Sequence, residues 1–390
     1  MISSKNQEIL IIGGGVIGLS LARELRRKGI EKITILERGE IGKESSFAAA
    51  GMLSPQAEAE SADEFFHFCT ESLRLYPRFA EELLEETGVS IELDRAGTLY
   101  PAFSETDVRI IRERFARQQK AGLEVEHLSA IETHKLEPFV SPDVLEGLFF
   151  PNDWQVENRK LLHALQKYAE FNGIEILEQT GIKKLIIEKN RVVGAETEKE
   201  KFFAERVVLA TGAWTSLIKA DSFVLPEIKP IRGQMISFHT AKRLFGKVIY
   251  SPRGYLVPRQ DGRILVGATV EDAGFDKSVT ESGIEFLREQ ALEIAPTLIN
   301  LEIQESWAGL RPFASDGLPV IGEIPGIENL FIATAHYRNG ILLAPMTAQV
   351  LTDKIAGDSF SEYLEIFSPR RFQKIENNGL HRLEAGKNSV

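Results

Sequence analysis

The chain has 390 residues, 43% of them hydrophobic and 26% charged, which is enough for two packed domains. Its formal net charge of −11 disfavours nucleic acid as a partner, because an acidic surface repels a phosphate backbone. The one cysteine, Cys69, excludes an intrachain disulfide and a cysteine-based metal cluster, and the histidines show no metal-binding spacing.

The apolar run at residues 9–21 could be mistaken for a leader segment. It holds four glycines, lacks a basic start and has no small-residue cleavage site after it. It is also shorter than the roughly 20 residues that a bilayer span requires. We therefore expect a cytoplasmic protein without a membrane span or a metal ion.

The next signal is a strand, a glycine turn and a helix. Residues 8–12 are apolar and β-branched, which predicts a buried parallel strand. Gly13-x-Gly15-x-x-Gly18 then opens a helical pattern that ends at Gly29. The first glycine permits a tight turn, the second lets the backbone approach a pyrophosphate, and the third packs helix on strand. The helix N-terminus would present free N–H groups to phosphate.

A second buried strand is predicted over residues 33–36, and it ends at Glu37. A carboxylate about 20 residues after the glycines suits the hydroxyls of an adenosine ribose. The same charge would repel a ribose 2′-phosphate, which disfavours NADP. The alternative is a plain strand-turn-helix with glycines for packing, and the acid at the end of the second strand favours dinucleotide binding over it.

Three further segments favour a flavin. Ser45 and Ser46 precede a run of small residues against which a flat ligand could lie. Residues 205–218 contain an apolar strand that ends at Thr211 and Gly212, and residues 329–333 predict another strand, followed by a turn and a helix over 341–355. The N-terminus of that helix could stabilise the charge of a reduced flavin. No second GxGxxG appears, so the expected reductant is a small substrate.

These motifs together resemble a known family. The fingerprint, "SSFAAAGML", "VVLATGAW", "IKPIRGQM", "WAGLRPFASDGLPVIG" and "HYRNGILLAP" occur in the order typical of the D-amino-acid-oxidase-type flavoproteins. The resemblance extends over residues 8–356 and is strongest to the glycine oxidases of thiamine biosynthesis. It implies FAD, oxidation of an amine α to a carboxylate, and hydrogen peroxide as by-product. We expect the FAD to be non-covalent, because Cys69 lies in the wrong region and "SSFAAAG" has no histidine. Our hypothesis for the reaction is hydride transfer to flavin N5, with no acid–base catalytic residue.

The resemblance and the fingerprint together give the expected ligand contacts. The expected FAD-binding residues are Gly13, Gly15, Val16, Ile17, Gly18, Glu37, Arg38, Ser45, Ser46, Ala50, Gly51, Met52, Ile182, Thr211, Gly212, His336, Tyr337, Arg338, Asn339, Gly340, Ile341 and Leu342. The expected substrate-binding residues are Arg311, Tyr255 and Arg338.

Other segments indicate a second domain. Residues 254–269 read as two alternating strands joined at Asp261-Gly262, and residues 97–103 and 231–238 add strands. We expect an α/β fold, α+β overall, with a Rossmann-like FAD-binding domain and an interleaved antiparallel-sheet substrate domain. The predicted FAD-binding domain is 1–90, 151–222 and 307–367; the substrate domain is 91–150 and 223–306; and 368–390 is a C-terminal tail.

Arg311 follows a predicted strand and lies among residues that otherwise read as core. A buried charge is costly unless it is paired, and a guanidinium can hold a carboxylate by two parallel hydrogen bonds. The substrate carboxylate is the partner that the family implies. The alternative is a structural salt bridge to Glu305 or Asp316, since most arginines are structural.

The physiological amine stays open at this point. Glycine is the first expectation; sarcosine, D-alanine, D-proline or a larger D-amino acid could use the same chemistry. Oxygen is the expected acceptor, but the chain could instead be the FAD subunit of a hetero-oligomeric amine dehydrogenase. We also expect a homo-oligomer, with a tetramer as the form seen in similar proteins.

Overall fold

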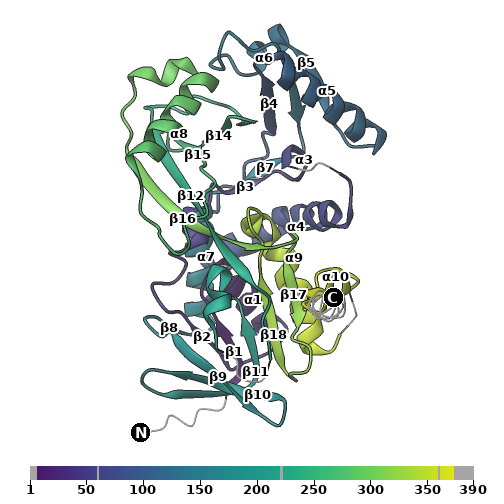
Figure 1. Ribbon diagram of the computed structural model, residues 1–390, viewed down its shortest axis with the longest axis vertical. Helices are drawn as coiled ribbons and strands as arrows, with labels where there is room; N and C mark the ends of the chain where they lie inside the picture. Colours follow the sequence, from purple (N-terminus) through teal and green to yellow (C-terminus); the bar gives the residue numbers. More distant parts are fainter. Residues whose placement is uncertain (1–6, 59–60, 220–222, 359–360, 373–390) are drawn as a thin grey trace, which may run out of the picture.

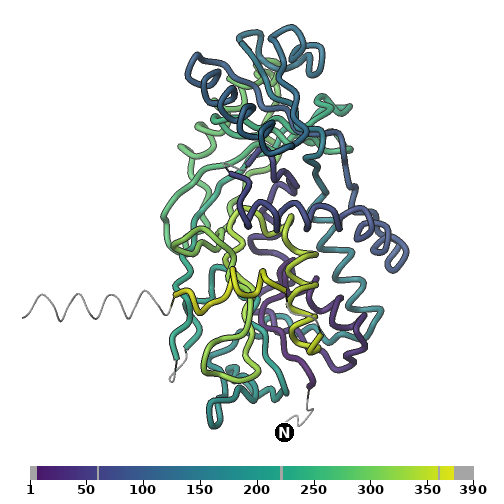
Figure 2. Tube along the Cα trace, turned by 90° about the vertical axis from the view of Figure 1, so that its right-hand side faces the viewer, coloured from purple at the N-terminus to yellow at the C-terminus, as the bar shows by residue number. Residues whose placement is uncertain are grey.

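The computed structural model describes residues 7–58, 61–219, 223–358 and 361–372. Two large β-sheets occupy opposite ends of an elongated molecule (Figure 1). A parallel-rich sheet lies in the lower half, and a largely antiparallel sheet lies in the upper half. In the perpendicular view the segment around residues 100–150 again lies at the top, far from the N-terminal strands (Figure 2). The fold class is therefore the predicted one.

The lower sheet has the strand order β17-β18-β11-β1-β2-β8, and a β9–β10 hairpin extends from β11. Strands β18, β11, β1, β2 and β8 are parallel, while β17 runs antiparallel to β18. The bounds are β1 (Gln7–Ile12), β2 (Ile33–Leu36), β8 (Glu175–Leu177), β9 (Ile182–Glu188), β10 (Arg191–Thr197), β11 (Lys201–Leu209), β17 (Val320–Glu323) and β18 (Leu330–Thr334).

The central strand β1 explains where a cofactor can bind. Ile9, Ile11 and Ile12 pair with β2 on one side and with β11 on the other, and all are buried. The carboxyl ends of these parallel strands meet at one edge of the sheet, where ligands of open α/β sheets bind. The strands predicted over 8–12, 33–36, 205–218 and 329–333 are all present at this edge.

Helices α1, α7 and α9 pack on this sheet, and α4 packs on α7 and α9. Helix α1 also contacts α9 and α7. Apolar residues at helical spacing supply the contact, and Gly29 with φ +91° ends α1 as predicted. The bounds are α1 (Val16–Arg27), α4 (Glu64–Thr87), α7 (Asn158–Phe171) and α9 (Gly340–Ala356).

The upper sheet has the order β16-β12-β15-β14-β13-β4-β6-β5, antiparallel except between β13 and β4. Helices α5, α6 and α8 pack on it. The bounds are β4 (Thr98–Ala102), β5 (Glu126–Ser129), β6 (Glu146–Phe150), β12 (Ile228–His239), β13 (Val248–Ser251), β14 (Gly254–Pro258), β15 (Arg263–Gly267), β16 (Glu305–Ala314), α5 (Glu105–Lys120), α6 (Ala130–Leu136) and α8 (Glu281–Ile294).

Strands β12 and β16 form the longest ladder of the molecule. Ten residue pairs join them, from Ile228 opposite Ala314 to Ser237 opposite Glu305. Both strands also contact η1 (Gly212–Leu217), which follows the nucleotide-side strand β11. The ladder therefore connects the two halves. Arg311 lies inside β16, opposite Ile231, so the prediction that it follows a strand was wrong.

The remaining elements are short, and η2 packs on α8. They are α2 (Ser45–Ala48), β3 (Met52–Leu53), α3 (Pro55–Glu58), β7 (Trp154–Gln155), η2 (Pro296–Asn300) and α10 (Tyr363–Ile366). The predicted domain boundary at 307 falls within β16, and the division into domains stays a prediction. Residues 1–6 and 373–390, which include most of the predicted tail, lie outside the described residues. None of the described helices is long and apolar enough to cross a membrane.

Candidate active site

The turn between β1 and α1 has the geometry that its glycines predict. Gly13 has φ +109°, and a Cβ on it would lie 2.3 Å from the Ala210 carbonyl oxygen. A Cβ on Gly18 would lie 2.0 Å from the Gly13 carbonyl oxygen. Both positions therefore need glycine for close packing of turn, helix and strand. The backbone N–H of Val16, the first residue of α1, donates to Ser46 Oγ at 3.0 Å.

Glu37 lies buried at the end of β2 beside this turn. Its two carboxylate oxygens accept from the backbone N–H groups of Gly14 at 2.8 Å and Gly39 at 2.9 Å. Each carboxylate oxygen has two lone pairs, so both can still accept from hydroxyl groups of a ligand. The acid is thus fixed in position and keeps acceptor capacity toward the cavity that it lines.

A cavity of about 290 Å³ lies at the carboxyl edge of the parallel sheet. Beyond the predicted residues its lining includes Trp214, and the Arg38 guanidinium stacks 3.8 Å from the centre of that ring. The predicted FAD-binding residues that line the cavity are Gly13, Gly15, Val16, Ile17, Glu37, Arg38, Ser45, Ser46, Ile182, Thr211, Gly212, His336, Tyr337, Arg338, Gly340 and Ile341.

The loop from β18 into α9 closes the far end of this cavity. Ala335 and Tyr337 have φ +59° and +47°, a left-handed conformation that is uncommon for residues other than glycine. Helix α9 then begins at Gly340 with no side-chain cap at Asn339, so its first N–H groups remain available to a ligand. His336 is buried, with Nε2 3.0 Å from Thr347 Oγ1, and burial lowers its pKa to about 3.

These features fit FAD. The N-terminus of α1, where Ser46 binds the first N–H group, suits a pyrophosphate. Glu37 suits ribose hydroxyls, and the uncapped N-terminus of α9 suits a group that becomes anionic. Two predicted residues do not line a cavity. Gly18 packs against Gly13, and Leu342 is buried with its carbonyl oxygen accepting from Ser72 Oγ at 2.6 Å.

A second, smaller hollow of about 80 Å³ adjoins the first and shares Ser45, Ala49, Tyr337, Arg338 and Ile341 with it. It lies under the upper sheet, and β12, β14 and β16 all contribute lining residues. The predicted substrate-binding residues Arg311, Tyr255 and Arg338 all line it, together with the predicted FAD-binding residues Ala50, Gly51, Met52 and Asn339.

Arg311 has hydrogen-bonding capacity left for a ligand. Its Nη1 donates to the Thr269 carbonyl oxygen at 3.0 Å and approaches that of Arg232 at 3.4 Å. Within the described part of the chain, no acid lies within 4 Å of its guanidinium. The two acids considered as structural partners are engaged elsewhere. Glu305 pairs with Arg159 at 3.1 Å, and Asp316 pairs with Arg371 at 2.6 Å.

The residues around Arg311 limit its motion and the space above it. A Cβ on Gly233 would lie 2.3 Å from Arg311 Nη2, so the guanidinium rests directly on the β12 backbone. Tyr255 is buried, and its hydroxyl lies 3.7 Å from Met235 Sδ. Burial raises the pKa of Tyr255, and the nearby Arg311 charge opposes that rise. The phenol is therefore a neutral donor at working pH.

Arg338, the third predicted substrate residue, is already engaged. Its Nη2 donates to Tyr250 Oη at 2.9 Å and lies 3.5 Å from Glu58 Oε1. The Glu58 charge raises the pKa of Arg338. The two arginines of this hollow thus differ: one is paired with an acid, and the other is not.

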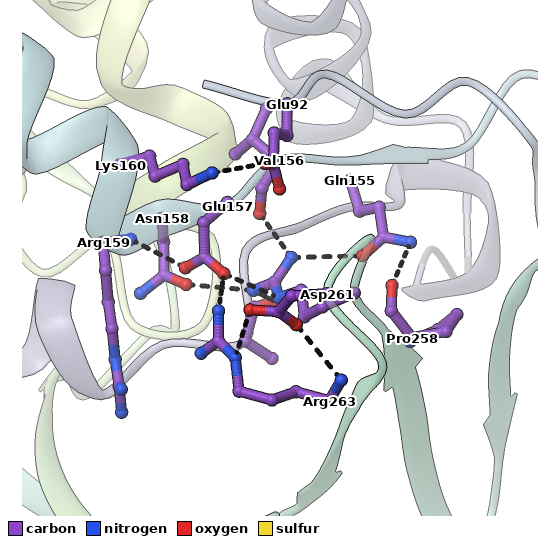
Figure 3. Close-up of polar contacts among 12 residues, drawn as sticks. Glu92, Gln155, Val156, Glu157, Asn158, Arg159, Lys160, Pro258, Asp261 and Arg263 are labelled. Carbon is purple, nitrogen blue, oxygen red and sulfur yellow. Dashed lines mark hydrogen bonds and ion pairs between the residues drawn. The ribbon is translucent and has the colours of Figure 1, made fainter. Parts of the chain in front are cut away.

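A network of buried polar groups supports the wall of the hollow (Figure 3). The Arg259 guanidinium, fully buried, donates to Ala50 O at 2.8 Å, Val156 O at 2.7 Å and Asn158 Oδ1 at 3.0 Å. Its Nε lies 3.4 Å from Glu157 Oε2, at ion-pair rather than hydrogen-bond geometry. Burial lowers the pKa of Arg259 to about 10, which still leaves it charged at neutral pH.

The network reaches the cofactor side through Asn158. The side-chain amide of Asn158 donates to the carbonyl oxygens of Ser46 at 2.8 Å and Phe47 at 3.1 Å. Arg259 and Asn158 therefore hold the small-residue segment that begins at Ser45 by hydrogen bonds to its carbonyl oxygens. Gly51, with φ +71°, permits this approach, since a Cβ there would lie 2.1 Å from the Val156 carbonyl oxygen.

Glu58 and Arg259 are the charged residues at the substrate hollow that sequence reasoning missed. Arg259 lies beside the Asp261-Gly262 turn, where an arginine is ordinarily exposed, and its partners come from distant segments. Glu58 follows the small-residue segment in an acidic stretch without a motif. The excess of small residues just before it was a signal that this wall is tightly packed.

The site and the fold together define an FAD-dependent oxidoreductase. A family described as FAD dependent oxidoreductase, or DAO, matches residues 8–354, and the chain belongs to this family. The predicted resemblance and the FAD cofactor are thus confirmed.

Individual relatives give a finer comparison. The chain is 33% identical over 354 residues to glycine oxidase of Pseudomonas aeruginosa, covering 90% of this chain and 95% of that protein. It is 36% identical over 372 residues to the bifunctional protein ThiO/ThiG of Trichormus variabilis, covering 94% of this chain but 55% of that longer protein. The crystal structure of glycine oxidase from Geobacillus kaustophilus superposes with a TM-score of 0.89 at 32% identity, covering 93% of this chain and 98% of that one. The chain is a glycine-oxidase-like enzyme.

Proposed function

We propose that the chain oxidises glycine to its imine, which water hydrolyses to glyoxylate and ammonia, while oxygen is reduced to hydrogen peroxide. Sarcosine and small D-amino acids are the further substrates we expect. The observation that carries the proposal is the guanidinium of Arg311, which has no acid within 4 Å in the described structure and lines a small hollow beside the cofactor cavity. A monocarboxylate would supply the missing charge.

The size of the hollow supports a small substrate. Its volume of about 80 Å³ is much smaller than the 290 Å³ of the adjoining cofactor cavity, and the buried side chains of Met235 and Tyr255 form part of its wall.

The chain's own residues would bind and orient the substrate. Arg311 holds the carboxylate by two parallel hydrogen bonds, and the neutral Tyr255 hydroxyl donates a third. The substrate Cα then points toward the adjoining cofactor cavity, with the amine neutral. Fixing this orientation can lower the barrier by several kcal/mol. No acid–base side chain is required at the reacting carbon, and His336 is turned to Thr347.

FAD, when bound, supplies the hydride acceptor at N5. The residues that would hold it are those lining the large cavity, from the α1 N-terminus and Glu37 to the α9 N-terminus. The N–H groups and the dipole of α9 stabilise negative charge that develops near them during the reaction.

Anaerobic reduction of the flavin tests the proposal. The purified holoenzyme is mixed without oxygen with glycine, sarcosine, D-alanine or D-proline, and the flavin absorbance is followed. We expect glycine to bleach it fastest, and peroxide to appear when oxygen is admitted. Failure of all four to bleach the flavin would end the proposal. Bleaching without oxygen consumption, but with reduction of a dye, would favour the amine dehydrogenase alternative.

Two wider proposals follow from the same relatives. We propose that the imine supplies the thiazole of thiamine, which the resemblance to the enzymes of that biosynthesis supports. Growth of a strain lacking this chain, with and without thiamine, tests it. We also propose a homo-oligomer, with a tetramer as the expected form, to be checked by light scattering after size exclusion.

A further inference from the structure

The substrate hollow contains an acid that the proposed function does not use. Glu58 lines it together with Arg311, Arg338 and Tyr255, and it is the acid among the lining residues, all of which are described. Its side chain is 17% exposed, and its Oε1 lies 3.5 Å from Arg338 Nη2. A carboxylate in a site for a carboxylate substrate weakens substrate binding, because the two like charges repel each other.

The segment that carries Glu58 is held firmly in place. The fully buried carboxylate of Asp153 accepts from the backbone N–H groups of Gln56 at 3.0 Å and Ala57 at 2.8 Å. The Gln56 side chain in turn donates to Gln118 Oε1 at 3.2 Å and to the Glu124 carbonyl oxygen at 3.0 Å. The anchored helix α3 therefore fixes the contact between Glu58 and Arg338.

The pairing makes the two guanidinium groups of the hollow unequal. Arg338 is held between Tyr250 Oη and Glu58, whereas Arg311 contacts backbone carbonyl groups and has no acid within 4 Å among the described residues. Two cations and one anion leave one net positive charge in the hollow. One substrate carboxylate neutralises that charge, and a second would face Glu58.

We infer that Glu58 is a specificity-determining residue that masks Arg338 and restricts the hollow to ligands with a single carboxylate. The inference rests on the proposed function for the role of Arg311. Amino acids and amines with two carboxylates are the class that Glu58 excludes. Once the Glu58 charge is removed, Arg338 becomes free to bind the second carboxylate by charge-assisted hydrogen bonds.

Binding of two non-oxidised acids to the holoenzyme tests this inference. Glycolate carries one carboxylate and malonate carries two, and each dissociation constant is measured from the perturbation of the bound flavin's absorption spectrum. In Glu58→Gln, which keeps the shape and removes the charge, we expect the malonate-to-glycolate affinity ratio to rise about tenfold. A tenfold change corresponds to 1.4 kcal/mol. Glu58→Ala is the second variant and should shift the ratio in the same direction.

Two controls separate masking from other effects. Glu85→Gln removes a carboxylate from an exposed position on α4 and should leave the ratio at the wild-type value. In the double variant Glu58→Gln/Arg338→Gln the gain should disappear, because the second cation is gone.

An unchanged ratio in both Glu58 variants would overturn the inference, and so would a gain that persists in the double variant. The measurement needs no turnover. If glycine fails to bleach the flavin while the malonate gain is present, the proposed function fails and the masking of Arg338 stands. If glycine is oxidised and the malonate-to-glycolate ratio is unchanged, the proposed function stands and the masking of Arg338 fails.

Discussion

Two arginines near the substrate hollow, the buried Arg259 and the half-buried Arg311, differ in what surrounds them. Arg259 donates to three backbone or amide oxygens within 3.0 Å and has Glu157 beside it, so the protein itself supplies its counter-charge. Arg311 donates to carbonyl oxygens and has no counter-charge among the described residues. A structural arginine is saturated by its own chain, whereas a binding arginine keeps a charge to be neutralised by a ligand.

The largest effect that follows from this comparison is on stability. Replacing Arg259 by methionine leaves several buried carbonyl and amide oxygens unsatisfied, while Glu157 keeps Arg263 as its partner at 2.6 Å, so we expect the free energy of unfolding to fall by about 3–5 kcal/mol. Urea denaturation of the holoenzyme measures it. Arg117→Met, at an exposed position of α5, is the matched control and should change stability by less than about 0.5 kcal/mol. Equal stability of Arg259→Met and the wild type would remove the distinction between the two arginines.

The second effect is on substrate affinity. Lysine at position 311 keeps the charge but loses the fork, so one charge-assisted hydrogen bond of about 1.5–3 kcal/mol is lost. We expect the KM for glycine to rise about 10- to 100-fold in Arg311→Lys, with the free energy of unfolding changed by less than about 1 kcal/mol. Steady-state peroxide assays give the KM. A KM within twofold of the wild-type value would show that Arg311 does not bind the carboxylate.

His336 extends the comparison to a buried base that stays neutral. Burial lowers its pKa to about 3, below the unfolded value of about 6.5, so the unfolded chain binds the proton more readily. The stability it contributes is present above pH 6.5 and is lost as the pH falls toward 3. Between pH 6.5 and 5 the loss should be about 1–2 kcal/mol. Urea titrations at the two pH values should show a smaller difference for His336→Asn, while the exposed His67→Asn should behave like the wild type.

The smallest expected effect is the change in KM when the Tyr255 hydroxyl is removed. Removing the Tyr255 hydroxyl deletes one neutral hydrogen bond of about 1 kcal/mol, so the KM of Tyr255→Phe should rise about three- to tenfold. Its stability should change little, because the hydroxyl has Met235 Sδ as its neighbour at 3.7 Å. A KM as high as that of Arg311→Lys would mean that the phenol, and not the guanidinium, carries carboxylate recognition.

Local signals in the sequence were enough for the nucleotide-binding half. Gly13, Gly15 and Gly18 predicted the turn, and at Gly13 and Gly18 only glycine fits. The apolar strands on either side are short, continuous and buried. The hairpin at Asp261-Gly262 was predicted from its turn residues in the same way, and β14 and β15 bear it out. The motifs also predicted Arg311, Tyr255 and Arg338 as substrate-binding residues, and all three line one hollow.

Contacts between distant segments were not predictable. Arg259 binds Ala50, which is separated from it by 209 residues, and nothing near either residue encodes that pairing. Glu58 meets Arg338 because Asp153 anchors α3. The position of Arg311 inside β16 depends on the register with β12, which the sequence pattern of either strand alone does not fix.

The ladder between β12 and β16 has a consequence for changes in chain length. Ten consecutive pairs set Arg311 opposite Ile231, and side chains alternate between the two faces of a strand. Deleting or inserting a single residue of β16 between Arg311 and an end of the ladder would turn the guanidinium to the opposite face. Length variation within β16 is therefore expected to abolish glycine binding.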